Sequence, residues 1–135
     1  MKMELEINSE YSEPVNFSFE KVKQFAELSG DKNPIHVDPV YASKTPFKKC
    51  IVHGLLATSV FTKMMAGKFP GPGSVHLEQT LNFKKPVYVD ENYVAILKLI
   101  DKRTTSKGKL IYKISTQLLD KNDAILIDGI AMILF

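Results

Sequence analysis

The second half of the chain follows the two-residue period of β-strands. Between residues 75 and 83 apolar side chains alternate with polar ones, and longer runs of the same character cover 92–101, 109–120 and 124–135. Short polar sequences separate these runs. The pattern predicts four consecutive strands, and such strands most simply pair antiparallel.

The first half predicts helices and loops instead. Residues 16–30 favour a helix in which Ser18 is the N-cap and Gly30 ends the helix in a left-handed conformation. A helical turn is expected near 39–43, where a proline suits the first helical position. Residues 54–67 are mostly apolar and leave little polar face, which predicts a helix enclosed on most sides. A sheet wrapped around this enclosed helix is an α+β fold.

Composition indicates the number of domains, the partners and the location to expect for this fold. With 135 residues, of which 44% are hydrophobic and 24% charged, the chain fits a single domain over residues 1–135. The net charge is +3, but the lysines are scattered, which argues against a nucleic-acid partner. The one cysteine, Cys50, cannot form an internal disulfide, and we expect it to be structural. No apolar run is long enough to span a bilayer, so we expect a cytoplasmic protein with no membrane partner.

The stretch SGDKNPIHVD, residues 29–38, is the first candidate for chemistry. Pro34 stiffens this loop, so a rigid corner can bring the side chains of Asp31 and His36 to one point. A carboxylate and an imidazole that share a water form a workable acid–base pair. Asp31 and Asn33 are also ordinary turn residues that bond their own backbone, and the residues alone leave this alternative open.

A second candidate lies at the start of the apolar helix. His53 and Gly54 stand at its entrance, where the first-turn N–H groups have no helical partner and attract negative charge. Gly54 has no Cβ, so a ligand carbonyl could approach its backbone N–H closely. Both residues are therefore candidates for binding a substrate. Gly54 could equally serve only to let the helix pack tightly against the sheet.

These residues resemble a known signature. The run FAELSGDKNPIHVDPVYA, residues 25–42, is similar to the hydratase 2 motif of the MaoC-like (R)-specific enoyl-CoA hydratases. The segments IVHGLL and GPGSVHLEQTLNFKKPVYVDE also resemble that family, so the likeness covers nearly the whole chain. The positions that fit the motif are Phe25, Ser29, Gly30, Asp31, Asn33, Pro34, Ile35, His36 and Ala42.

The resemblance implies a hot-dog fold and the reversible addition of water to a trans-2-enoyl-CoA, giving the (R)-3-hydroxyacyl-CoA in fatty acid metabolism. The resemblance implies that Asp31 acts as base toward the water and that His36 protonates the α-carbon. Gly54 would bind the thioester carbonyl through its N–H, because charge builds on that oxygen during addition. Asn33 would shape the site, and Thr62 would line the acyl pocket.

The resemblance implies no metal or redox cofactor, since CoA is part of the substrate. The three histidines, His36, His53 and His76, also lack the spacing of metal ligands. We expect a homodimer or a dimer of dimers, because a lone sheet of this size would leave its edge strands open.

Three other functions compete with a hydratase. A 3-hydroxyacyl-carrier-protein dehydratase would use the same acid–base pair, and the residues do not separate it from an enzyme acting on CoA. A hot-dog acyl-CoA thioesterase usually places an acid on or near the central helix, and residues 54–67 contain none. An inactive acyl-CoA-binding module would lack Asp31 or His36, and both are present.

Overall fold

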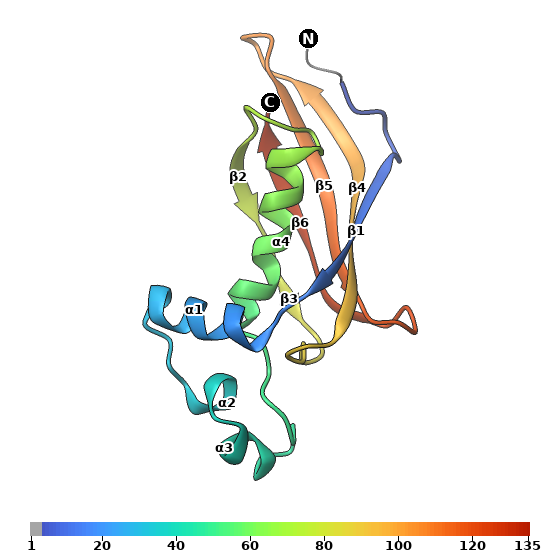
Figure 1. Ribbon diagram of the computed structural model, residues 1–135. Helices are drawn as coiled ribbons and strands as arrows, with labels where there is room; N and C mark the ends of the chain where they lie inside the picture. The colour runs from blue at the N-terminus through green and yellow to red at the C-terminus, as the bar shows by residue number, and fades with distance from the viewer. Residues whose placement is uncertain (1–3) are drawn as a thin grey trace.

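One long helix lies against a curved antiparallel sheet in the computed structural model, which describes residues 4–135 (Figure 1). The helix, α4, covers Gly54–Gly67 and has the bounds predicted for it. Strands β4 (Asn92–Thr104), β5 (Leu110–Leu119) and β6 (Ile125–Leu134) pair antiparallel in chain order. Each falls within about three residues of a predicted run, because strict alternation leaves only one register that buries the apolar face.

The core forms where α4 meets this sheet. Alternate residues are buried from Tyr93 to Leu99 in β4 and from Tyr112 to Leu118 in β5, as the alternation predicts. The largest fully buried side chains come from the helix and these strands: Phe61, Met64, Met65, Leu97, Leu99, Tyr112, Ile114, Leu118, Ile127 and Ile133. The predicted α+β fold, a sheet wrapped around a central helix, is therefore confirmed.

One strand of the sheet was not predicted from the sequence. β1 (Glu10–Asn16) pairs antiparallel with β4, so the expectation of helices and loops alone in the first half was wrong. The strand contains Pro14 and Glu13, which are poor strand formers. A proline is tolerated here because β1 is an edge strand, whose outward N–H groups need no partner within the sheet.

The strand predicted over residues 75–83 is broken in two. β2 (Val75–Gln79) and β3 (Asn82–Phe83) both pair with β6, and the sheet order is β1-β4-β5-β6-β2. β2 therefore lies beside β6 at the far edge, although it precedes β4 in the chain. The break coincides with a close approach, since a Cβ on Gly129 would lie 1.8 Å from the Thr80 carbonyl oxygen.

Three short helices precede α4. α1 (Phe19–Ser29) begins at the predicted cap, where the Ser18 hydroxyl accepts a hydrogen bond from the Lys21 N–H, and ends at Gly30 with φ 81°. α2 (Pro34–Val37) and α3 (Pro39–Ser43) follow, each with a proline in its first turn. Within residues 4–135, no helix combines the length and the apolar character that a membrane crossing needs.

α4 is less enclosed than predicted. One stripe of the helix faces away from the sheet, and on it the Leu55 side chain is 66% exposed. Ser59 and Thr62 are exposed on the same stripe. In a single copy of the chain, the helix is thus covered by the sheet on one side and open on the other.

Candidate active site

The corner between α1 and α2 is built by local hydrogen bonds. Asp31 Oδ1 accepts from the Asn33 N–H at 3.2 Å, and Asn33 Oδ1 accepts from the Ile35 N–H at 3.3 Å, which caps α2. Asp31 and Asn33 therefore do form the turn, as the second interpretation of this motif held. That role leaves the other carboxylate oxygen of Asp31, Oδ2, available for chemistry.

The same corner brings Asp31 and His36 together. Asp31 Oδ2 lies 4.0 Å from His36 Nε2. This separation is too long for a direct hydrogen bond, but one water can bridge it. The Asp31 side chain is half exposed, whereas His36 is buried. The geometry predicted for the pair is thus present, and its catalytic role remains a prediction.

The ring of His36 is oriented by the backbone of a distant residue. His36 Nδ1 lies 2.7 Å from the Ile51 carbonyl oxygen, and a carbonyl only accepts, so Nδ1 carries the hydrogen. In the neutral ring, Nε2 then presents a lone pair toward Asp31. Burial lowers the pKa of His36, and nearby His53 lowers it further, while the Ile51 bond and the Asp31 carboxylate act in the opposite direction. The neutral imidazole is therefore the prevailing form at neutral pH.

His53 lies beneath this pair rather than in an open pocket. Its side chain is only 2% exposed, and its ring stacks on the His36 ring with centroids 3.9 Å apart. His53 Nε2 donates to the backbone carbonyl of Asp31 at 3.0 Å. The sequence analysis proposed substrate binding for His53, and a side chain so deeply buried offers a substrate no accessible polar atom.

Asp31, His36 and His53 are potential metal ligands that lie close together in the fold. Their spacing in the sequence did not indicate such a group. Their ligand atoms lie within 4.8 Å of one another. However, His36 Nδ1 is engaged with Ile51, and the two rings stack at 27°, so their in-plane lone pairs do not converge on one point. The arrangement is poor for a cation, and metal-free chemistry stays a prediction.

A pocket of about 390 Å³ opens beside the pair. His36 and Gly54 line it together with Phe83, Lys84 and Lys85. As the first residue of α4, Gly54 has an N–H with no helical carbonyl within reach. The structure also supports the packing interpretation of this glycine, because a Cβ there would lie 2.6 Å from Phe83 Cε1. Close packing and carbonyl binding are compatible roles for Gly54.

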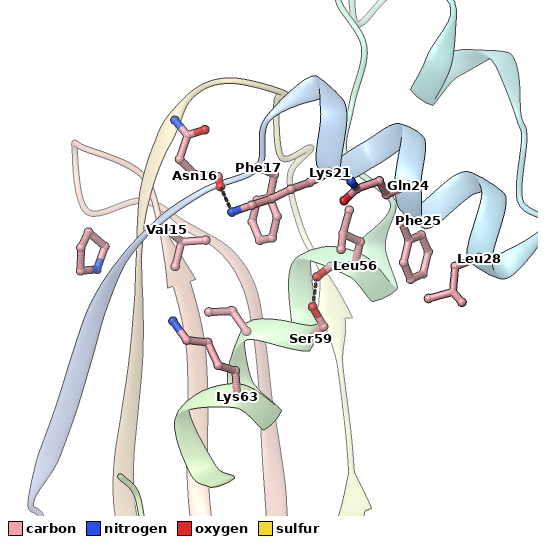
Figure 2. A pocket seen from close by; sticks show the side chains of 12 residues that line it. Val15, Asn16, Phe17, Lys21, Gln24, Phe25, Leu28, Leu56, Ser59 and Lys63 are labelled. Atoms are coloured by element: carbon pink, nitrogen blue, oxygen red, sulfur yellow. Dashed lines mark hydrogen bonds between the residues drawn. The ribbon is translucent and has the colours of Figure 1, made fainter. Parts of the chain in front are cut away.

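A second groove of about 380 Å³ runs between α1, α4 and the end of β1 (Figure 2). Its apolar walls include Phe25 and Leu56, and Lys21 and Lys63 stand at its rim. The Phe25 and His53 rings also make an edge contact, with centroids 4.9 Å apart, so the groove adjoins the histidine pair. Thr62, the predicted acyl-pocket residue, lines neither pocket; its hydroxyl donates to the carbonyl of Ser59, which does line the groove.

Comparison with known proteins places the chain in a family. Residues 3–120 match the family described as the MaoC-like domain. The chain belongs to the MaoC-like family. It is 34% identical over 129 residues to an (R)-specific enoyl-CoA hydratase of Aeromonas caviae, covering 96% of this chain and 94% of that protein. It is also 40% identical over 114 residues to a mitochondrial 3-hydroxyacyl-[acyl-carrier-protein] dehydratase of Arabidopsis thaliana, covering 84% and 67%.

Solved structures agree with the MaoC-like assignment. The (R)-hydratase from A. caviae superposes with a TM-score of 0.89 at 34% identity and covers 96% of both chains. An R-hydratase from Pseudomonas aeruginosa gives a TM-score of 0.86 at 30% identity, covering 96% of this chain and 81% of that one. The family resemblance and the hot-dog fold inferred from the motif are both confirmed.

Sequence reasoning missed three contributors to this MaoC-like site. Ile51 acts through its carbonyl oxygen, which no side-chain pattern reveals. Phe83 follows the alternation of a strand and gives no other sign that its ring covers Gly54. The stacking of His53 on His36 requires residues 51–53 to lie beside the turn between α1 and α2. The hydrogen bond from the Ile51 N–H to the Ile35 carbonyl holds them there.

Proposed function

We propose that this protein is an (R)-specific enoyl-CoA hydratase, which adds water reversibly to a trans-2-enoyl thioester in cytoplasmic fatty acid metabolism. The observation that carries the proposal is the 4.0 Å gap between Asp31 Oδ2 and His36 Nε2, beside a pocket that His36 shares with Gly54. A water in that gap would donate one hydrogen to each acceptor. Its lone pairs would then point away from the pair, toward a bound substrate.

The lowered pKa of His36 suggests a different division of labour from the one drawn from the motif. Protonation of the α-carbon by a charged His36 would require a form that is scarce at neutral pH. Neutral His36 can instead take one proton from the water as its oxygen bonds to the β-carbon. The same proton then passes to the α-carbon, and the other hydrogen, held by Asp31, stays on the new hydroxyl. Both hydrogens and the oxygen of the water thus end in the product.

Gly54 is the group we assign to the thioester carbonyl. During addition at the β-carbon, negative charge gathers on the carbonyl oxygen, and an N–H at a helix N-terminus stabilises it. α4 has 14 residues and begins at Gly54, so its dipole reinforces this donor. The carbonyl carbon itself is not attacked, which suits hydration rather than thioester cleavage.

The carrier of the acyl group is either CoA or an acyl carrier protein, as the two kinds of relative suggest. Lys84 and Lys85 line the pocket, and their charge suits the phosphate that both carriers have at the thiol-bearing arm. Lys84 also pairs with Asp128 at 2.9 Å, which fixes its position. Parallel assays with crotonyl-CoA and the crotonyl acyl carrier protein would show which carrier gives the higher kcat/KM.

The assay that tests the function follows both ends of the substrate. With crotonyl-CoA, a hydratase lowers the absorbance of the conjugated enoyl group while the thioester survives. A thiol reagent would therefore detect no free CoA, and chiral analysis would give a product of R configuration. Thiol release equal to substrate loss would show a thioesterase, and an S product would exclude the proposed stereochemistry.

We also propose that two copies of the chain pair through β2. Four of the five residues of this edge strand are exposed, and among them Val75 and Leu77 are 51% and 48% exposed. An edge strand that exposes apolar side chains together with open N–H and C=O groups can pair with another strand. The opposite edge, β1, carries Pro14 and Glu13 and is protected in the way that solitary edges are.

Analytical ultracentrifugation at micromolar concentration tests the dimer and its location. We expect a mass of two or four chains for the natural sequence. Leu77→Lys should shift the mass toward one chain, whereas Ser12→Lys on the opposite edge should leave it unchanged. A monomeric natural protein, or equal effects of the two substitutions, would contradict this proposal.

A further inference from the structure

His53 is a buried titratable group that the proposed reaction does not use. Its Nε2–H donates to the Asp31 carbonyl, so Nδ1 carries the lone pair of the neutral ring. That nitrogen is buried and has no hydrogen-bond partner within residues 4–135. An unpaired buried polar atom is costly, and an apolar ring would avoid the cost. The contacts of the rest of the ring must therefore explain why a histidine stands here.

Those contacts fall on both members of the acid–base pair. One face of His53 stacks on His36 at 3.9 Å between centroids, and its Nε2–H binds the backbone of Asp31 at 3.0 Å. Phe25 holds His53 by an edge contact at 4.9 Å and 61°. No other described side chain contacts one partner's ring and hydrogen-bonds the other partner's backbone in this way.

Asp31 and His36 need a common contact that keeps their separation fixed. The bond from His36 Nδ1 to Ile51 restrains the Nδ1 edge of the imidazole, whereas Nε2, the atom that faces Asp31, has no hydrogen bond of its own to a described residue. The Asp31 carboxylate is half exposed and belongs to a turn on the protein surface. Without a contact common to both, ring rotation and turn movement would change the 4.0 Å gap independently.

We propose that His53 is a positioning residue that holds Asp31 and His36 at the separation one bridging water requires. The inference rests on the proposed function, since it concerns the geometry of the same reaction. The ring stack limits rotation of His36, and the hydrogen bond ties the Asp31 corner to the start of α4. His53 itself contacts no substrate.

Two substitutions separate these contributions. His53→Phe keeps a stacking ring but loses the donor to Asp31, and His53→Gln keeps a donor of similar reach but loses the ring. We expect kcat for crotonyl-CoA hydration to fall about tenfold in His53→Phe, because small misplacements of catalytic groups cost factors of this order or more. His53→Gln should recover part of that loss. KM should change less than twofold in both, since the side chain binds no substrate.

A second readout does not depend on activity. The charged and titratable groups near the His36 ring are Asp31, His53 and the pocket lysines Lys84 and Lys85. Only His53 is removed in the two variants, and its proximity lowers the pKa of His36. NMR titration of the His36 imidazole should therefore show a higher pKa in both. Leu118→Val, a buried substitution on β5, controls for general destabilisation and should leave the titration unchanged.

The outcomes are distinguishable. A natural protein without hydratase activity would refute the proposed function, while the His36 titration would still test the contact with His53. An unchanged kcat and an unchanged His36 titration in both folded variants would overturn the positioning role. A rise in KM at constant kcat would also overturn it, because His53 would then bind substrate directly.

Discussion

Two regions of this molecule are built on different principles. The sheet and α4 are held by apolar side chains buried between distant segments, such as Leu97 on β4 and Phe61 on α4. The loop segment, residues 30–53, is held by short-range turns and caps, and α2 and α3 together have only nine residues, four and five. The first region supplies stability, and the second carries the acid–base pair.

The loop segment meets the rest of the fold through backbone hydrogen bonds and through Val52, which belongs to the apolar core. The Val52 N–H donates to the Val87 carbonyl at 2.7 Å, and the Val89 N–H donates to the Cys50 carbonyl at 3.3 Å. Cys50 is buried there, and burial raises the pKa of its thiol, which suits a structural residue. Substitutions in the loop segment should therefore change activity, and substitutions in the sheet and α4 should change stability.

The largest effect should come from the loop segment. Asp31→Asn and His36→Gln should each lower kcat/KM for hydration about a hundredfold or more, since acid–base groups contribute factors of that order. Both side chains lie at the protein surface or in a pocket, so circular dichroism should show an intact fold. Near-native activity in either folded variant would remove that residue from the mechanism.

A substitution in the core of the sheet should have the opposite effect and change stability without changing activity. Leu97 is fully buried, and Leu97→Ala should lower the free energy of unfolding by about 2–5 kcal/mol in a urea titration. The kcat per folded molecule should stay within about twofold of the natural value, because the side chain lies in the core and not in the pocket. A large loss of kcat in the folded variant would show that the two regions are not separable.

Gly54 lies where the regions join, and its two roles can be separated. Gly54→Ala keeps the N–H but places a methyl group against Phe83 and beside the carbonyl site. We expect hydration to fall about tenfold, less than the loss of a whole oxyanion donor. Phe83→Ala in the same chain removes the clash, and it should not restore activity if the carbonyl binds here. Full recovery in the double variant would leave Gly54 with packing alone.

The smallest effect should be a change of stability without a change of chemistry. Ser18→Ala removes the N-cap hydrogen bond of α1 and should cost about 1 kcal/mol of unfolding free energy. Hydration should be unaffected, because Ser18 lies outside the loop segment. Ser12→Ala, on an exposed part of β1, is the matched control and should change neither quantity.

The sheet and α4 could be predicted from the sequence more fully than the contacts of the loop segment. The long strands, α4 and the caps of α1 follow from local periodicity and residue preference, so their bounds were predictable. β1 escaped because an edge strand tolerates Pro14 and glutamates, and the β2–β3 break depends on Gly129 passing close to Thr80. The motif identified Asp31 and His36, but their neighbours Ile51 and His53 act through a backbone oxygen and a ring stack that only the folded chain reveals.

The most direct test of the mechanism is the pH dependence of kcat/KM for crotonyl-CoA hydration. Neutral His36 is the working form in our account, and burial keeps its pKa below the usual value. Activity should therefore rise with pH through a pKa below about 6.5 and stay level through neutral pH, and the His36→Gln variant should lose this limb. A kcat/KM that instead falls as pH rises through that range would show that charged His36 is required, and it would contradict the proposed division of labour.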